Sequence, residues 1–306
     1  MTNAVSVSDL TKRYGDRTVV DRLSLELPRG VVAGFIGPNG AGKTTTMAML
    51  LGLVRPSAGT GSVLGRPIDR PAAFLGDVGA LIEVPAFYPS ISGRRNLEVL
   101  AIAGGHDPVG IPQLLELVGL AGRGEDRYRS YSLGMKQRLG IAAALLGDPE
   151  LLILDEPANG LDPQGVQEMR GLIGRLAGGG RTVLVSSHDL SELEQVCDWV
   201  VLIEGGRALY EGPTGDLLDD RRGRLAVVPE RIADGAHLIE LLRSRDFVVG
   251  HEDGRIVVRS DGRDHPAMAA AVNRMAFDAG IVLVELSPVR ATLEERYLSM
   301  MEVGAQ

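Results

Sequence analysis

Cysteine, lysine, aromatic residues and long apolar runs are all scarce in this sequence of 306 residues. Its single cysteine, Cys197, cannot form an internal disulfide, which suits a reducing cytosol. The most apolar stretches, residues 31–37 and 151–154, are far shorter than the roughly 20 residues that a membrane-spanning helix needs. The first residues lack a basic segment followed by an apolar one, so we expect no export signal. These absences predict a cytoplasmic chain without a membrane span.

Basic residues are also in the minority, with 32 lysines and arginines against 40 aspartates and glutamates and a net charge of −8. Nonspecific attraction to nucleic acid or to an anionic membrane surface needs a basic face. We therefore expect no nucleic-acid partner. Hydrophobic residues make up 44% of the chain and charged residues 24%, values that are ordinary for a soluble globular protein.

What the chain does contain, up to about residue 215, is an alternation of short β-branched runs with helical stretches. Continuous apolar runs such as VVAGFI, LLILD and TVLVSS are typical of parallel strands that are covered on both faces. Between residues 85 and 148, helix-like segments with glycine breaks replace these runs. We therefore predict an α/β domain over residues 1–218 that contains a helical subdomain at about residues 85–148.

A charged, glycine-containing segment, DDRRGR, separates this domain from a smaller one over residues 219–306. The order of elements predicted there is β-α-β-β-α-β, which matches the ferredoxin-like pattern. Asp253-Gly254 between two apolar runs is a strong hairpin signal. No ligand motif stands out in this small α+β domain, so we expect a dimerisation or docking module.

The segment GPNGAGKT, residues 37–44, fits the phosphate-binding pattern G-x-x-x-x-G-K-[ST] and lies between an apolar strand and a helix-like stretch. Glycines allow successive backbone N–H groups to converge on phosphate oxygens, and a helix N-terminus adds partial positive charge. Lys43 would reach the β and γ phosphates, and the Thr44 hydroxyl would hold Mg²⁺. The expected nucleotide contacts are Gly37, Pro38, Asn39, Gly40, Ala41, Gly42, Lys43, Thr44 and Thr45.

Two adjacent carboxylates, Asp155 and Glu156, follow the apolar strand in LLILDEP. At the end of a strand, neighbouring side chains can serve one site with different tasks. We expect Asp155 to ligate Mg²⁺, usually through water, and Glu156 to orient and deprotonate a water that attacks the γ-phosphate. This pair is a second, independent indication of nucleotide hydrolysis.

The ordered motifs GPNGAGKTT, YSLGMKQRLGIA, LLILDEP, NGLD and SSH together resemble the nucleotide-binding subunit of an ATP-binding cassette (ABC) transporter. The similarity covers about the first 215 residues. It implies a P-loop NTPase of the ABC type, with a mixed sheet core and a helical insertion, and ATP with Mg²⁺ as cofactors. YSLGMKQRLG lies in the position of the family's signature, LSGGQ; the matching residues are Ser132, Leu133, Gly134, Met135 and Lys136.

The resemblance also implies roles for individual residues. Tyr14 falls where the family stacks an aromatic ring on adenine. His188, in SSH, matches the switch histidine that contacts the γ-phosphate and helps to hold the attacking water. Ser132, Gly134 and Met135 belong to the signature, which contacts ATP held by a second subunit; the serine offers its hydroxyl and the glycine its backbone N–H.

The same resemblance implies partners. Two subunits, as a homodimer or as a heterodimer with a similar subunit, would sandwich two ATP molecules head to tail. Asp162, in NGLD, matches a loop that runs along the partner subunit. Separate integral-membrane permease subunits would hold the chain at the inner face of the cell membrane and receive its motion through the insertion around residues 85–100.

Glu83 and the letters GMK depart from the family's usual pattern. Glu83 stands where most members have a glutamine that binds Mg²⁺ and water. Two interpretations remain for it: a ligand of Mg²⁺, or a loop carboxylate without a metal role. GMK replaces the common GGQ. Both departures resemble a subgroup of drug-resistance, bacitracin and lantibiotic-immunity exporters, so antibiotic resistance is the expected context.

We therefore expect an ATPase that powers an ABC transporter, an exporter of the drug, antibiotic or peptide type. One alternative is a non-transport ABC ATPase, although such relatives tend to carry two cassettes or long coiled-coil arms. A second is a P-loop GTPase or kinase, which would leave the signature and the SSH motif unexplained. A third is an ATP-gated regulatory binding module with weak turnover.

Overall fold

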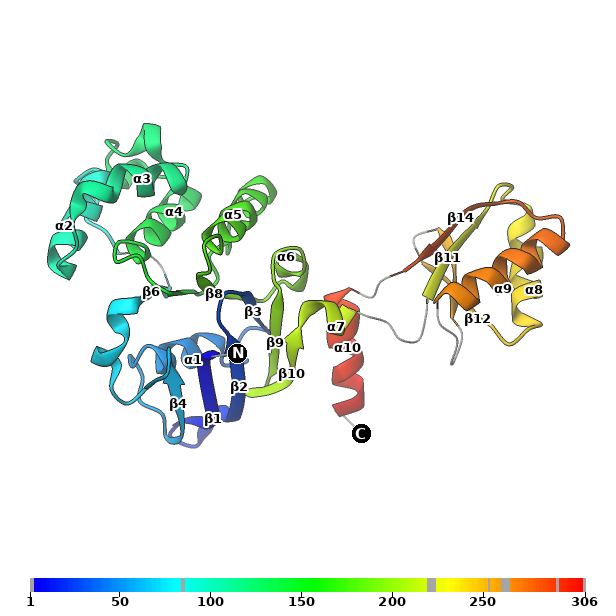
Figure 1. Cartoon of the computed structure of the whole chain (residues 1–306), viewed down its shortest axis with the longest axis horizontal. Coiled ribbons are helices and arrows are strands. Elements are labelled where there is room, and N and C mark those ends of the chain that lie inside the picture. Colours follow the sequence, from blue (N-terminus) through cyan, green and yellow to red (C-terminus); the bar gives the residue numbers. More distant parts are fainter. Residues whose placement is uncertain are drawn as a thin grey trace. The chain divides into compact units, whose positions relative to one another are not determined.

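The computed structural model describes residues 3–83, 86–218, 224–252, 254–259, 265–289 and 292–304. The chain divides into two compact units, Met1–Thr214 and Gly215–Gln306. This division falls close to the boundary expected after residue 218, and most of the expected linker, residues 219–223, lies outside the described residues. Figure 1 shows both units.

A six-stranded sheet, in the order β10-β9-β3-β8-β7-β6, forms the centre of the first unit. Its strands are β3 (Val32–Ile36), β6 (Val78–Leu81), β7 (Leu151–Leu154), β8 (Thr182–Ser187), β9 (Trp199–Glu204) and β10 (Arg207–Pro213). The first five pair in parallel, and β10 joins β9 antiparallel. Every residue of β3, β7 and β8 is buried, as their continuous apolar runs predict.

A four-stranded antiparallel sheet, in the order β2-β1-β4-β5, shares its core with the first sheet. Its strands are β1 (Asn3–Tyr14), β2 (Arg17–Pro28), β4 (Ala58–Val63) and β5 (Arg66–Pro67). The shared core also includes side chains of helix α1 (Lys43–Leu50), and Leu10, Phe35 and Met47 are almost fully buried in it. The observed fold confirms the predicted α/β class with a mixed sheet core.

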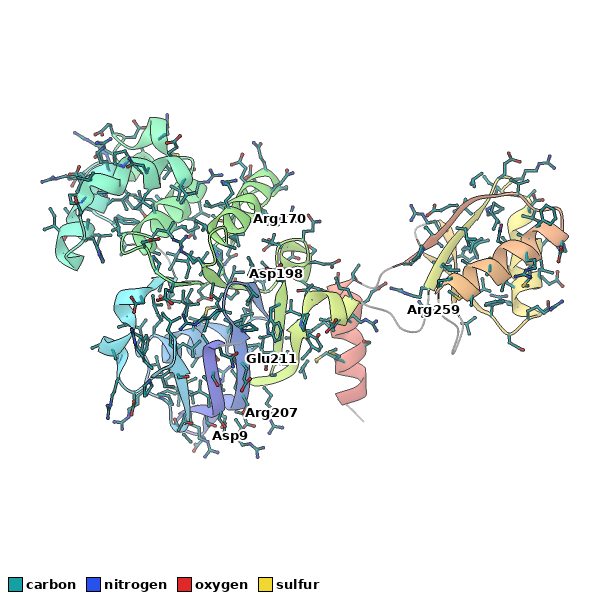
Figure 2. The ribbon with its side chains drawn as sticks, in the orientation of Figure 1. Asp9, Arg170, Asp198, Arg207, Glu211 and Arg259 are labelled. Carbon is teal, nitrogen blue, oxygen red and sulfur yellow. The ribbon has the colours of Figure 1, made fainter. Side chains whose placement is uncertain are left out.

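The central strand β3 is held near both ends by its neighbours. Asp198, labelled in Figure 2, directly precedes β9, and its carboxylate accepts a hydrogen bond from the N–H of Val32 at 3.1 Å. After the last residue of β3, the N–H of Gly37 donates to the carbonyl oxygen of Ser187 at 3.4 Å. These bonds fix where the strand ends and where the loop that follows it begins.

Three helices form the insertion between β6 and β7 and lie together in Figure 1: α2 (Gly93–Gly104), α3 (Ile111–Leu117) and α4 (Leu133–Ala144). Ser92 and Ser132 are the N-caps of α2 and α4. Their hydroxyls accept the backbone N–H groups of Arg95 and Met135, at 3.2 and 3.3 Å. The helical insertion is the one expected from the sequence, although its expected first residue, Pro85, lies outside the described residues.

Two more helices of the first unit are α5 (Pro163–Leu176) and α6 (Leu190–Glu194). Helix α7 (Thr214–Leu218) begins at the last residue of this unit. Asp162 is the N-cap of α5, and its carboxylate accepts the N–H of Gly165 at 3.0 Å. Asp189 caps α6 in the same way, with the N–H of Ser191 at 2.9 Å. Within the described ranges, no helix has both the length and the apolar character that a bilayer crossing requires.

The second unit is built on an antiparallel sheet in the order β12-β13-β11-β14. Its elements are β11 (Arg224–Pro229), α8 (Asp234–Arg243), β12 (Val248–Glu252), β13 (Arg255–Arg259), α9 (His265–Asp278), β14 (Leu283–Pro288) and α10 (Leu293–Gly304). Leu225, Leu238 and Val272 come from a strand and two helices and are buried in one core. The unit therefore has a core of its own.

The predicted order β-α-β-β-α-β is present in this unit, followed by a helix, α10, that was not expected. β13 lies between β12 and β11, so the two strands joined by α8 are not neighbours. The ferredoxin-like assignment stays a prediction. β12 and β13 pair on either side of the predicted hairpin, of which Asp253 lies outside the described residues.

Candidate active site

The phosphate loop connects β3 to α1, in the strand-loop-helix context that its pattern requires. Gly40 and Gly42 have φ values of +84° and +104°, a backbone region that glycine enters without steric cost. A Cβ atom on Gly42 would also lie 2.8 Å from the carbonyl oxygen of Val19 on β2. Glycine is therefore required at Gly42 both for its conformation and for the close approach of β2.

Lys43, the first residue of α1, folds back over the loop. Its Nζ donates to the carbonyl oxygens of Gly37 at 2.7 Å and Pro38 at 3.3 Å. The same ammonium forms an ion pair with Glu156 Oε1 at 3.2 Å. Lys43 is only 5% exposed, so a buried positive charge lies where the loop and the LLILDEP carboxylates meet.

Thr44 and Asp155 are in direct contact. The Thr44 hydroxyl donates to Asp155 Oδ2 at 2.6 Å, and the hydroxyl of Ser186 donates to Asp155 Oδ1 at 2.5 Å. Ser186 is fully buried on β8 and also accepts the N–H of Glu156 at 2.9 Å. One serine therefore orients a carboxylate and the backbone of the residue that follows it.

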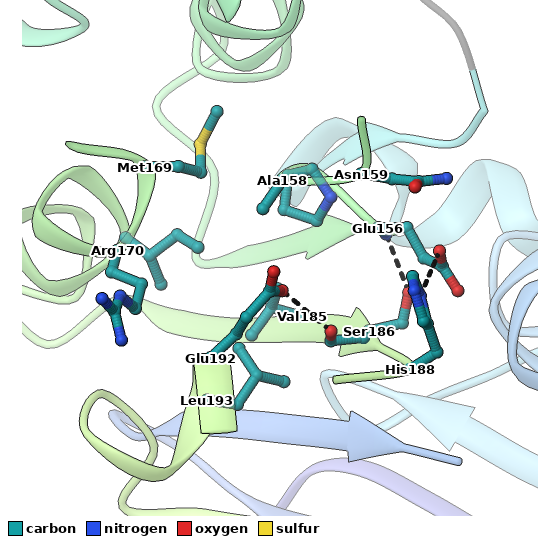
Figure 3. Close-up of a pocket in the computed structure, with 13 residues that line it drawn as sticks. Glu156, Ala158, Asn159, Met169, Arg170, Val185, Ser186, His188, Glu192 and Leu193 are labelled. Carbon is teal, nitrogen blue, oxygen red and sulfur yellow. Dashed lines mark hydrogen bonds and ion pairs between the residues drawn. The ribbon is translucent and has the colours of Figure 1, made fainter. Parts of the chain in front are cut away.

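Glu156 has φ of +47°, an uncommon backbone conformation for a residue with a side chain. Its Oε2 lies 3.0 Å from His188 Nδ1, and its Oε1 faces Lys43. Figure 3 shows Glu156 and His188 side by side next to a cavity. The turn after β7 thus directs the carboxylate between an ammonium and an imidazole.

These side chains meet because β3, β7 and β8 are parallel neighbours, whose carboxyl ends form one edge of the sheet. Ligands of open α/β sheets bind at this edge. The structure brings together five of the predicted site residues, namely Lys43, Thr44, Asp155, Glu156 and His188.

Ser186 belongs to this cluster and was not predicted as a site residue. The sequence did carry a signal for it, because TVLVSS places two serine hydroxyl groups at the end of a buried strand, directly after an apolar run. Buried hydroxyl groups need hydrogen-bond partners, and the partners of Ser186 are the carboxylate of Asp155 and the N–H of Glu156.

Glu83 follows β6 closely, at the same edge of the sheet as Asp155, because β6 and β7 pair in parallel. Its backbone has φ of +61° and its side chain is exposed. Within the described part of the chain, no group of three or more His, Cys, Asp or Glu side chains is arranged to hold a metal ion. A metal role for Glu83 stays a prediction.

Tyr14 is the last residue of β1 and is 51% exposed, so about half of it is accessible. The ammonium of Lys12 lies 4.8 Å from the ring centroid, a cation–π distance. Its stacking on adenine stays a prediction.

The signature segment lies at the start of α4, away from the cluster just described. Ser132 caps the helix, and Gly134 and Met135 are partly exposed in its first turn. Together with Leu161 and Asp162 they line one open depression. Among the described residues, no hydrogen bond or ion pair joins this helix start to the phosphate loop, and a role of the segment in ATP contact stays a prediction.

Comparison with characterised proteins decides the family. The chain is 39% identical to the bacitracin transport ATP-binding protein BcrA of Bacillus licheniformis, over 99% of this chain and 99% of the relative. The chain is a member of the ABC transporter family. The model of that family, described as "ABC transporter", matches residues 20–159.

Other members of the ABC transporter family agree with this assignment. The daunorubicin resistance ATP-binding protein DrrA3 of Streptomyces coeruleorubidus is 35% identical over 97% of this chain and 95% of the relative. A solved ATP-binding subunit of an ABC transporter has a TM-score of 0.62 and 31% identity, and the match covers 71% of this chain and 92% of that subunit. The resemblance inferred from the motifs is therefore confirmed, and this ABC protein is an ATPase subunit that powers transport.

Proposed function

We propose that this ABC ATPase powers an exporter of the drug, antibiotic or peptide type, with Glu156 as general base and His188 as its partner at the γ-phosphate. The observation that carries the catalytic part is the convergence of Lys43, Thr44, Asp155, Glu156 and His188 at one edge of the sheet. The class of cargo is supported by likeness to BcrA and DrrA3 along nearly the whole chain.

Mg²⁺ fits the oxygen donors at this site. The Thr44 hydroxyl and Asp155 Oδ2 lie 2.6 Å apart, and both are hard oxygen ligands of the kind that Mg²⁺ prefers. Mg²⁺ in nucleotide sites is usually bound by one or two protein oxygens together with phosphates and water, so a cage of several carboxylates is not needed. When bound, the ion would neutralise charge on the phosphates. Thr44 and Asp155 would hold it.

The phosphates of ATP would be held by the loop N–H groups and by Lys43. Lys43 ion-pairs with Glu156 in this structure, so an anionic γ-phosphate would compete for the same ammonium. Glu156 would then be left to accept a proton from water, with His188 at 3.0 Å fixing the direction of its carboxylate. Ser186 keeps the backbone of Glu156 in place, because its hydroxyl oxygen accepts a hydrogen bond from the N–H of Glu156.

We propose further that the working unit is a head-to-tail dimer. In this dimer, the phosphate loop before α1 of one copy would face the start of α4 of the other copy, an arrangement that two-fold symmetry repeats at both sites. Ser132 would donate its hydroxyl and Gly134 its N–H to ATP held by the partner copy. Tyr14 would stack on adenine.

A separate permease supplies the membrane path in this proposal. The insertion carries exposed apolar side chains, among them Tyr88 and Leu100, within the stretch around residues 85–100 that is expected to contact the permease. A multi-span membrane protein should copurify with the full chain from membranes solubilised in mild detergent. Recovery of the chain without any such partner would contradict the transport assignment.

The catalytic assignment is tested by Glu156→Gln. Removal of a general base typically lowers turnover by about 10² to 10⁴. We expect ATP hydrolysis to fall by that range, ATP binding to persist, and a dimer to accumulate on size-exclusion chromatography in ATP.

Glu150→Gln is the matched control. Glu150 forms an exposed ion pair with Arg29 at 2.6 Å, and such pairs contribute little. Turnover of Glu150→Gln should equal that of the parent. Parental turnover of Glu156→Gln would instead show that another group is the base.

A further inference from the structure

Glu192 is a half-buried carboxyl group that the proposed mechanism does not use. It lies on α6, and its Oε2 accepts a hydrogen bond from the hydroxyl of Ser187 at 3.0 Å. Ser187 is the last residue of β8 and is buried. Glu192 therefore reaches from a helix to the strand end that directly precedes His188.

Ser187 makes a second hydrogen bond, across His188. Its Oγ accepts the N–H of Asp189 at 2.9 Å. A hydroxyl has one proton and two lone pairs. Ser187 donates its proton to Glu192 and accepts the N–H of Asp189 with one of its lone pairs. The carboxyl group thus fixes the direction of a hydroxyl that closes the turn around His188.

Glu192 also lines the cavity beside the catalytic cluster (Figure 3). Glu156 and His188 lie on one side of that cavity, and Arg170 of α5 lies on another. Burial raises the pKa of Glu192 above its usual value; Asp189 also raises it, while Ser187, His188 and Arg170 lower it. The carboxyl group is kept in a partly dry position close to the base.

We propose that Glu192 is a positioning residue for His188: through Ser187 it fixes the turn that holds Nδ1 at 3.0 Å from Glu156. This inference rests on the catalytic roles proposed above for Glu156 and His188. Glu192 itself touches none of the groups that we expect to react. Glu192 would affect the attacking water only by fixing the position of the His188 imidazole.

The test is a set of variants of the full chain, assayed for ATP turnover. Glu192→Ala removes the acceptor for Ser187 and should lower kcat between about 10-fold and 100-fold, the range expected from a small displacement of a catalytic group. KM for ATP should stay within about twofold, because the phosphate loop is untouched. Glu192→Gln keeps an acceptor oxygen and should restore most of kcat. Ser187→Ala should behave like Glu192→Ala.

Gln195→Ala, which removes an exposed polar side chain just after the same helix, is the control and should leave kcat unchanged. Thermal unfolding of each variant shows whether a lower kcat results from a destabilised fold or from slower catalysis in a folded chain. If the role of Glu192 were merely structural, Glu192→Ala would lower the thermal unfolding midpoint and would impair ATP binding together with kcat. Glu192→Gln would then restore none of these three.

A His188→Ala background distinguishes failure of this inference from failure of the proposed function. If Glu192 acts through His188, Glu192→Ala should cost nothing further in that background. An equal loss in both backgrounds would overturn the inference. If His188→Ala itself keeps parental turnover, the catalytic role of the histidine is wrong, and the positioning role of Glu192 falls with it.

Discussion

Glu156 illustrates how far individual residues could be predicted. Its place after a buried strand, next to Asp155, led to its prediction as a base, and the structure places it in contact with Lys43 and His188. Its left-handed backbone and its hydrogen bond to Ser186 could not be predicted, because both depend on β8 lying beside β7. A sequence records which residues are present, whereas strand order decides which of them meet.

Cys197 carries a prediction of its own. Burial raises the pKa of its thiol from the usual 9.0 to about 12, and Asp198 adds to the shift. Because the thiolate is the reactive form, its population near pH 8 should be about a thousandfold lower in the folded chain than in the unfolded chain. Alkylation by iodoacetamide, followed by mass spectrometry, should be negligible in buffer and complete in denaturant. Rapid labelling of the folded chain would contradict the buried position.

Helix α10 begins at a local signal that is present in the sequence. Thr292 and Glu295 form a reciprocal capping box: the N–H of Glu295 donates to the threonine hydroxyl at 3.2 Å, and the N–H of Thr292 donates to the glutamate carboxylate at 3.1 Å. The pattern T-x-x-E therefore marks the helix start. Glu295 also forms an ion pair with Arg224 at 2.6 Å, a contact between distant residues that no local pattern indicates.

Helix α4 carries a prediction that separates capping from the proposed contact with a second chain. Ser132→Arg removes a cap and places a large cation at the start of the helix; it should abolish ATP hydrolysis while ATP binding by the monomer persists. Ser92→Ala removes only the equivalent cap of α2, at a cost of about 1 kcal/mol, and should keep turnover. ATP hydrolysis and equilibrium ATP binding should be measured for both variants. An active monomeric Ser132→Arg protein would contradict the dimer proposal.

For the whole molecule, the arrangement of the ATP-binding unit followed the motifs closely, because each motif is tied to a strand end or a helix start. The second unit has no such motif, and its strand order became known only from the structure. The two units have separate cores, with Leu10 and Phe35 in the first and Leu225 and Leu238 in the second. Each core should therefore stabilise its own unit.

A chain that ends at residue 218 tests this independence. We expect it to fold, to bind ATP, and to unfold within about 4 °C of the corresponding transition in the full chain, a shift of roughly 1 to 2 kcal/mol for a unit of this size. Calorimetry on both chains gives the comparison. An unfolded truncated chain would show that the second unit is needed for the stability of the first.

The helical insertion also bears on how the first unit forms during folding. β6 and β7 are hydrogen-bonded neighbours, yet residues 82–150 lie between them in the chain. Closing a loop of that length costs about 4 kcal/mol of chain entropy, beyond a constant term. Local helical contacts within the insertion do not carry this cost, so we infer that they form first and that the β6–β7 edge, with Asp155 and Glu156 after it, forms late. A newly synthesised, partly folded chain would then have no competent site with which to consume ATP.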